Sequence, residues 1–260
     1  EAIEHQTTTK KKVFVPKQRA EIHHLAQSFN KLLEYQDKAI KREQQFVTDA
    51  SHELKTPLAA IRGHINLIKR RGKEHPEIVA KSLQYIDSES SRMEILVNEL
   101  LELGRAKKQH QSIEPIDLVP IVQKESEILE REYSTCSVYI SSPTKLFYPI
   151  EVKDFRLIIH NLLDNAAKYS QNNAKIKVEL QKDNGYLILR VKDQGIGIRK
   201  ENYDKIFDRF YREDQAHSSQ IKGTGIGLAI VKDIVTKYHG KISVSANTPK
   251  GAIFEIKLPL

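Results

Sequence analysis

Asn161 and Asn165 stand four residues apart in a run typical of a helix, so their side chains project from one face. A neutral amide oxygen is a hard ligand that suits Mg²⁺. Farther along, Gly223, Gly225 and Gly227 precede a second helical run. Backbone N–H groups at such a helix start can cradle phosphate groups. The amide pair and the glycine-rich loop together predict a site for a magnesium-bound phosphate compound.

A further glycine group follows a strand-like run and contains Asp193, Gly195 and Gly197. The carboxylate at its head can accept a hydrogen bond from the exocyclic amine of adenine, and the glycines allow close approach of the backbone. Lys168 could meet phosphate oxygens, and Tyr169 offers a ring face to the base. Taken alone, this group also fits an ordinary turn. With the motifs around it, it predicts one nucleotide pocket.

His52 differs from the other histidines by its position. Ala50 and Leu54 belong to an apolar helical seam, and His52 lies about 200° from both, so it should face solvent. An exposed imidazole, with an ordinary pKa of about 6.5, is mostly neutral near neutral pH. Its free nitrogen can attack a phosphoryl group, and Glu53 can take the proton of the other ring nitrogen. The alternative is an exposed helical histidine without a role.

Thr56 follows His52 by one helical turn and shares its face. Its hydroxyl could hold a water molecule against a phosphorylated partner. The alternative is a helix-surface residue that happens to precede a proline. Pro57 has no N–H for the carbonyl of Glu53, which predicts a kink beside the histidine.

These segments, in this order, resemble those of a sensor histidine kinase of a bacterial two-component system, of the class with an E-x-x-T sequence beside the histidine. The resemblance runs from about residue 20 to the C-terminus and is carried by residues 46–58, 161–169, 193–197 and 223–228. It implies ATP-dependent autophosphorylation of His52 and transfer of the phosphoryl group to an aspartate of a response regulator. It further implies phosphatase activity toward that regulator, with the Thr56 hydroxyl positioning water.

The same resemblance assigns the ATP site residue by residue. Asn165 is the Mg²⁺ ligand, and Arg212 matches an arginine that reaches the γ-phosphate. Asn161 stands where hydrolytic relatives carry a glutamate, and an amide cannot take a proton from water. Lys222 departs from the glycine that many relatives have there. The expected ATP-binding residues are Asn161, Asn165, Lys168, Tyr169, Asp193, Gly195, Gly197, Gly223, Gly225 and Gly227, and the expected catalytic residues are His52, Glu53, Thr56 and Arg212.

Two other functions compete with this interpretation. The first is a signalling scaffold that binds nucleotide without catalysis, and the intact motifs count against it. The second is a gyrase-like ATPase, against which Asn161 argues because it replaces the glutamate that activates water.

Two long helices must position the histidine. Apolar spacings of three and four predict a helix over 21–71 and a second over 77–108, with a break from Gly72 to Pro76. One hairpin cannot bury both apolar seams, so two copies are expected to form a dimeric four-helix bundle. The seams comprise Val47, Ala50, Leu54, Leu58, Ile61, Ile65 and Ile68, and then Leu83, Ile86, Ser90, Met93, Val97 and Leu100.

The remaining residues, 116–260, mix strand-like and helix-like runs, which predicts an α/β two-layer sandwich. Strands are expected near 137–140, 174–181, 186–193, 241–246 and 252–258, and helices near 118–132, 153–168 and 226–239. The resemblance makes this the ATP-binding fold shared by histidine kinases, DNA gyrase and MutL. Phe207 and Phe210 are expected to anchor a lid over roughly 199–222, and the alternative of plain core packing does not exclude that role.

The composition suits long solvated helices joined to one compact domain. Of 260 residues, 39% are hydrophobic and 29% charged, and there is no apolar run of about 18 residues that could span a bilayer. The net charge of +8 comes without an aromatic-rich basic stripe or zinc-ligand spacing, so no nucleic-acid partner is expected. The single cysteine, Cys136, is expected to be a buried apolar side chain in a reducing compartment.

The chain begins at Glu1, and we expect it to be part of a membrane-anchored kinase, on the cytoplasmic face of the membrane. The basic residues between 10 and 19 are either solvated or lie near an anionic leaflet. Residues 20–34 resemble the second helix of a HAMP signalling domain, with a generic amphipathic helix as the alternative. The expected domains are a partial HAMP segment (1–35), a dimerisation and histidine phosphotransfer domain (36–110) and a catalytic ATP-binding domain (111–260).

Overall fold

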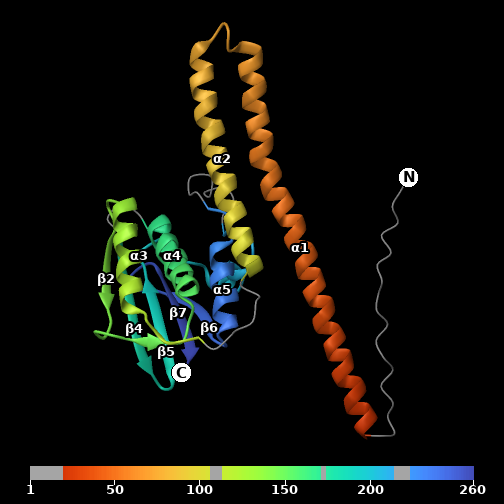
Figure 1. Ribbon diagram of the computed structural model, residues 1–260, viewed down its shortest axis with the longest axis vertical. Coiled ribbons are helices and arrows are strands. Elements are labelled where there is room, and N and C mark those ends of the chain that lie inside the picture. Colours follow the sequence, from red (N-terminus) through yellow and green to blue (C-terminus); the bar gives the residue numbers. More distant parts are fainter. Residues whose placement is uncertain (1–19, 106–112, 171–173, 214–222) are drawn as a thin grey trace.

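The computed structural model describes residues 20–105, 113–170, 174–213 and 223–260. It consists of a long helical hairpin with an α/β domain packed against the open end of its second helix (Figure 1). This architecture confirms the predicted fold class of a helical hairpin followed by an α/β two-layer sandwich.

The hairpin is formed by α1 (Ala20–Arg71) and α2 (Pro76–Arg105), and the predicted bounds of α1 are confirmed to within one residue. The chain turns at Gly72, whose N–H donates to the Ile68 carbonyl at 2.8 Å, and α2 then starts with a proline. Proline suits the first helical position because that residue needs no intrahelical N–H bond. The helix α1 runs unbroken through Pro57 and curves along its length (Figure 1).

The hairpin helices pack only on part of their apolar surface. Near the turn, the His64 ring stacks on Tyr85 with 4.8 Å between ring centroids, and its Nδ1 lies 3.3 Å from the Ser82 hydroxyl. Other large apolar side chains on both helices remain exposed, which is the pattern predicted for a hairpin that needs a second copy. They include Val47, Leu58, Ile65, Leu67, Leu83, Ile95, Val97 and Leu101.

The α/β domain contains one five-stranded sheet in the order β2-β4-β5-β7-β6, in which β2 and β4 are parallel and the other neighbours antiparallel. The helices that pack with the sheet are α3 (Val119–Glu132), α4 (Val152–Tyr169) and α5 (Gly227–Lys237). The strands are β2 (Ser137–Ser141), β4 (Lys175–Asp183), β5 (Tyr186–Lys192), β6 (Lys241–Ala246) and β7 (Ala252–Pro259). Every predicted strand and helix of this domain is therefore confirmed.

Four short elements were not predicted. They are the strand pair β1 (Ile116–Asp117) and β3 (Phe147–Tyr148), and the 3₁₀ turns η1 (Lys200–Asn202) and η2 (Lys205–Phe207). Elements of two or three residues are too short to display a hydrophobic period.

The core lies between the sheet and its helices. Along β7 the buried positions alternate, and the same alternation on β4 places Ile176, Val178 and Leu180 against the helices. Cys136 is buried at the edge of this core, as predicted. Within the described ranges, no helix combines the length and apolar character that crossing a membrane requires.

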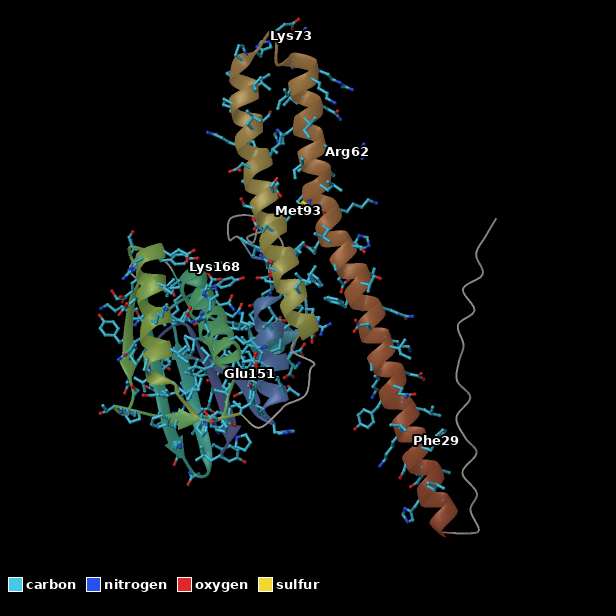
Figure 2. The ribbon with its side chains drawn as sticks, in the orientation of Figure 1. Phe29, Arg62, Lys73, Met93, Glu151 and Lys168 are labelled. Atoms are coloured by element: carbon cyan, nitrogen blue, oxygen red, sulfur yellow. The ribbon has the colours of Figure 1, made fainter. Side chains whose placement is uncertain are left out.

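An ionic cluster ties the N-terminal end of α4 to the C-terminal end of α5. The Lys237 ammonium lies 2.7 Å from Asp154 and 3.0 Å from Glu151, and the Tyr238 hydroxyl donates to Asp154 at 2.8 Å. Burial lowers the pKa of Lys237, but its bonds to the two carboxylates outweigh burial and raise that pKa above its ordinary value. Glu151 and Lys168 mark opposite ends of α4 (Figure 2), so this cluster fixes α4 and α5 far from the end that carries the candidate site.

Candidate functional site

The two predicted asparagines lie in the C-terminal half of α4, where both are half-buried. The Asn161 amide donates to the Leu157 carbonyl at 2.8 Å. Its Oδ1 lies against Gly227, so closely that a side chain at Gly227 would overlap it. The start of α5 can therefore approach α4 only because residue 227 has no Cβ.

The last turn of α4 contacts the segment that begins with Asp193. The Tyr169 carbonyl accepts a hydrogen bond from the Ile196 N–H at 3.2 Å, and a Cβ at Gly195 would lie 2.5 Å from that carbonyl. The Tyr169 ring is exposed. Lys168 forms an ion pair with Asp164 at 2.5 Å, which holds its ammonium on the α4 surface.

Asp193 is a buried carboxylate at the end of β5, with only 5% of its surface exposed. Its Oδ1 accepts hydrogen bonds from the N–H groups of Gly195 at 2.8 Å and Ala252 at 3.1 Å. Burial raises the pKa of this carboxyl, and the two backbone bonds oppose that rise. Because both bonds among the described residues go to Oδ1, Oδ2 is left as an acceptor for a ligand.

The backbone of Asp193 is held as firmly as its side chain. Its carbonyl accepts a hydrogen bond from the Asn247 amide at 2.7 Å, and its N–H donates to the Ala252 carbonyl at 3.0 Å. Gly251 has φ +117° and lies so close that a Cβ there would overlap the Asp193 carbonyl oxygen. Asn247 and Gly251 were not predicted as part of the site, since neither belongs to a motif of the sequence.

The glycine-rich loop leads directly into α5. Gly225 has φ +74°, and its carbonyl accepts a hydrogen bond from the Phe210 N–H at 2.9 Å. No side chain caps the first N–H groups of α5 among the described residues. Such groups carry the positive end of the helix dipole and are suited to an anion.

The aromatic segment before the loop packs in the core, which is one of its two predicted roles. Phe207 is buried and Phe210 is half-buried against the core. The last part of the predicted lid, residues 214–222 with Lys222 among them, lies outside the described residues. Arg212 is half-buried just before that segment. Arg209, which was not predicted as a site residue, forms an ion pair with Asp233 at 3.0 Å.

His52 is exposed on α1, as its helical angle predicts. The Thr56 hydroxyl donates to the His52 carbonyl at 3.3 Å, so the two residues share one face of the helix. Glu53 is half-buried and Pro57 is buried beside them. The proposed roles of these side chains in proton transfer and water positioning remain predictions.

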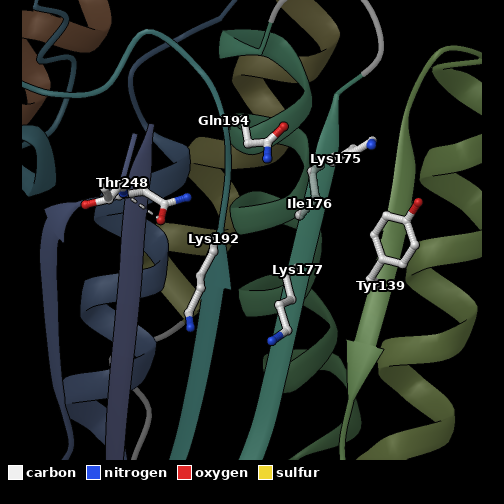
Figure 3. A pocket seen from close by; sticks show the side chains of 8 residues that line it. Tyr139, Lys175, Ile176, Lys177, Lys192, Gln194 and Thr248 are labelled. Carbon is white, nitrogen blue, oxygen red and sulfur yellow. Dashed lines mark hydrogen bonds between the residues drawn. The ribbon is translucent and has the colours of Figure 1, made fainter. Parts of the chain in front are cut away.

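The open face of the sheet has a shallow hollow that is separate from these residues (Figure 3). Its lining includes Tyr139, Lys177, Lys192 and Gln194. Lys177 and Lys192 both bond the Glu179 carboxylate, at 2.9 and 2.7 Å. Because Lys192 and Gln194 alternate with the buried Asp193, they project from the face opposite to the nucleotide motifs.

Two family models match the chain. The model for the His Kinase A (phospho-acceptor) domain matches residues 42–109. The model for the histidine kinase-, DNA gyrase B- and HSP90-like ATPase matches residues 151–260.

The curated relatives of the chain include signal transduction histidine-protein kinases. The signal transduction histidine-protein kinase ArlS of Staphylococcus aureus (strain USA300) is 37% identical over 243 residues, which are 91% of this chain and 53% of ArlS. The chain thus spans about half the length of the curated relatives it matches.

Solved structures of histidine kinases resemble the chain. The Acinetobacter baumannii kinase AdeS is 25% identical with a TM-score of 0.60, over 80% of this chain and 97% of AdeS. The mycobacterial sensor kinase MprB is 32% identical with a TM-score of 0.51, over 56% of this chain and 97% of MprB. The kinase ThkA, solved in complex with response regulator protein TrrA, shares the fold at 23% identity and a TM-score of 0.67, over 88% of this chain and 66% of ThkA.

The close approach at Gly251 generates a prediction about stability. Gly251→Ala should lower the free energy of unfolding by about 3 kcal/mol, because it combines an unfavourable φ with overlap on the Asp193 carbonyl. Gly185→Ala is the matched control: Gly185 has φ +79° but no neighbouring atom within 4 Å, so we expect a loss of about 1 kcal/mol. Urea denaturation measures both, and equal losses would mean that the contact with Asp193 is not tight.

Proposed function

The chain belongs to the histidine kinase family, and from this premise we propose that it phosphorylates itself on His52 with ATP and passes the phosphoryl group to an aspartate of a response regulator. The observation that carries the proposal is the convergence of three separate motifs at one end of the α/β domain. Asn161 contacts Gly227, and Tyr169 contacts the segment after Asp193. That domain is docked on the hairpin that presents an exposed His52.

We assign ATP recognition to both ends of this pocket. The Asp193 carboxylate would accept the adenine amine through Oδ2, and the Tyr169 ring would lie against the base. The first N–H groups of α5, with Gly223, Gly225 and Gly227, would bind phosphate oxygens. Lys168 and Arg212 would neutralise phosphate charge during transfer.

Magnesium would accompany ATP at the amide pair. Asn165 is half-buried on the α4 segment that carries Asn161, and its amide oxygen is the hard ligand that Mg²⁺ prefers. When bound, the ion would offset the negative charge of the phosphates. Among the described residues no group of three or more His, Cys, Asp or Glu side chains could hold a metal, so phosphate oxygens and water would complete its coordination.

The chemical step is a transfer from oxygen to nitrogen. The neutral imidazole nitrogen of His52 would attack the γ-phosphorus, and a P–N bond would form as the P–O bond to ADP breaks. Glu53 would take the proton of the other ring nitrogen. Asn161 supports kinase rather than ATPase chemistry, because its amide cannot take a proton from an attacking water.

The proposal also includes a protein partner of the chain and its location in the cell. A response regulator receiver domain is the proposed phosphoryl acceptor, supported by the similarity to ThkA, which was solved with its regulator. We place the chain at the cytoplasmic face of the membrane, as part of a longer sensor kinase. The partial HAMP assignment for residues 1–35 and the three domain boundaries remain proposals.

A homodimer is the proposed assembly, because apolar side chains of the hairpin such as Leu83 and Val97 are exposed by 55% and 42%. Burying the part of each such side chain that is still exposed stabilises association by about 1 kcal/mol. Sedimentation equilibrium at micromolar concentration should give twice the chain mass of 29.9 kDa. The double variant Leu83→Glu, Val97→Glu should shift the mass toward the monomer, whereas Gln84→Glu, on the same helix, should not. A monomeric wild-type chain contradicts the proposal.

Autophosphorylation has a direct chemical test. Incubation with γ-labelled ATP should give a protein label that is lost in acid and kept in alkali, because a P–N bond breaks when its nitrogen is protonated. His52→Gln should abolish the label, while His75→Gln, an exposed histidine on the same hairpin, should keep it. An acid-stable label would identify a hydroxyl acceptor and refute the proposal. Phosphate release without labelling would favour the ATPase alternative, and nucleotide binding without labelling would favour the scaffold.

Thr56→Ala should separate the two activities assigned to this helix face. Autophosphorylation should persist, since the attacking nitrogen and the ATP pocket are untouched. Dephosphorylation of the regulator should slow about tenfold, because one hydrogen bond that positions water is worth about 1–3 kcal/mol. Both rates are measured on one preparation, with Thr48→Ala, another exposed α1 threonine bonded to its own helix, as the control. Equal loss of both activities, or of neither, rejects this role for Thr56.

A further inference from the structure

The α/β domain is docked on the hairpin through an apolar contact. Leu96 and Leu103 of α2 are buried in the same cluster as the core of the α/β domain. Phe46 of α1 is half-buried there, and the Arg209 guanidinium lies 4.9 Å from the centroid of its ring. The docked arrangement is therefore held by specific contacts from both helices.

Glu99 brings a carboxylate from α2 into this contact, at the edge of the glycine-rich loop. The Thr224 hydroxyl, between Gly223 and Gly225, donates a short hydrogen bond to Glu99 Oε2. Three charged groups of α4 also act on Glu99: Lys168 and His160 favour its ionised form, and Asp164 opposes it. Two of the residues around this carboxylate, Thr224 and Lys168, belong to the segments assigned above to ATP phosphates.

The surroundings of Glu99 act on its pKa in opposite directions. Burial raises its pKa, while the Thr224 bond and the charge of Lys168 work against that rise. A carboxylate that is removed from water keeps its charge only where such partners compensate it. The Thr224 hydroxyl and the Lys168 charge that compensate Glu99 are also suited to a phosphate, because both anions accept hydrogen bonds and are stabilised by a nearby cation.

We propose that Glu99 is an intramolecular phosphate mimic that occupies the phosphate end of the nucleotide pocket while the α/β domain is docked on α2. The inference rests on the proposed function, and it concerns regulation of the same site. ATP reaches full affinity only after the domain leaves α2 or Glu99 loses its charge. By linkage, ATP favours the undocked arrangement by the same free energy by which undocking favours ATP.

The competition is specific for the phosphates and not for the base. Two anions at one set of donors repel each other, whereas adenosine carries no anionic group to compete with Glu99. Asp193, which is assigned to adenine, is bonded to Gly195 and Ala252 rather than to α2. The difference between ATP and adenosine therefore isolates the effect of the Glu99 charge.

The test is calorimetric titration of the full 260-residue chain with Mg-ATP and separately with adenosine. Glu99→Gln keeps an oxygen acceptor for Thr224 and removes the charge. We expect it to tighten ATP binding about tenfold, which corresponds to about 1.4 kcal/mol, and to change adenosine binding less than about twofold. Glu94→Gln removes the same charge from an exposed position of α2 and should leave both affinities unchanged. Asp193→Asn should weaken both ligands alike.

The outcomes separate this inference from the proposed function. Unchanged or weaker ATP binding by Glu99→Gln, with binding and labelling intact in the wild type, overturns the role of Glu99 alone. An equal gain for ATP and adenosine also overturns it, since a phosphate mimic cannot hinder a ligand without phosphates. Absence of ATP binding in every variant overturns the pocket assignment itself, and the role of Glu99 with it.

Discussion

The close packing of α4 against α5 is the constraint on which the candidate site depends. Asn161 and Gly227 lie in contact at one end of the helix pair, and Lys237, Asp154 and Glu151 hold the other end. A side chain at Gly227 would separate the helices there. Because α4 carries the amide pair and α5 starts directly after the glycine-rich loop, this single contact brings together residues that are more than 60 positions apart in the chain.

Asp193 is a buried carboxylate that is held in place without a charged partner among the groups that shift its pKa. Its burial favours the protonated form, and only backbone N–H groups counter that preference. A backbone donor cannot rotate away as a lysine can, so the direction of Oδ2 is fixed by β5 and β7. The segment around Gly251 thus supports the candidate site as much as the motif residues do, through the Asn247 side chain and the backbone of Gly251 and Ala252.

Much of the fold follows from sequence patterns, because α1, α2 and the central strands are long enough to display their hydrophobic periods. The motif residues, too, could be placed on one helix end or one loop from local spacing. The contacts between domains could not be predicted in this way. Glu99 and Thr224 are 125 positions apart, and although Thr224 lies in the glycine-rich loop, nothing in the sequence around Glu99 marks it as the partner of that loop. Arg209 over Phe46 is a similar case, since a charged residue and a half-exposed ring each look ordinary until the fold joins them.

The hairpin presents two kinds of surface along one helix. The exposed apolar positions of α1 and α2 require cover, while His52 and Thr56 require access. Separate faces of α1 satisfy both requirements, because a helix distributes residues around its axis at about 100° each. Pro57 is buried, and it leaves the carbonyl of Glu53 without its intrahelical donor.

Because α1 is one unbroken helix, a rotation about its axis acts on all of its residues. Its 52 residues extend about 78 Å, and Phe46 and His52 are fixed on it only six residues apart. A small rotation of α1 about its own axis would turn both residues through the same angle. The Phe46 ring would move away from the Arg209 guanidinium, and the His52 imidazole would point in a new direction. The contact of the α/β domain with α1 and the direction of the His52 side chain would therefore change together.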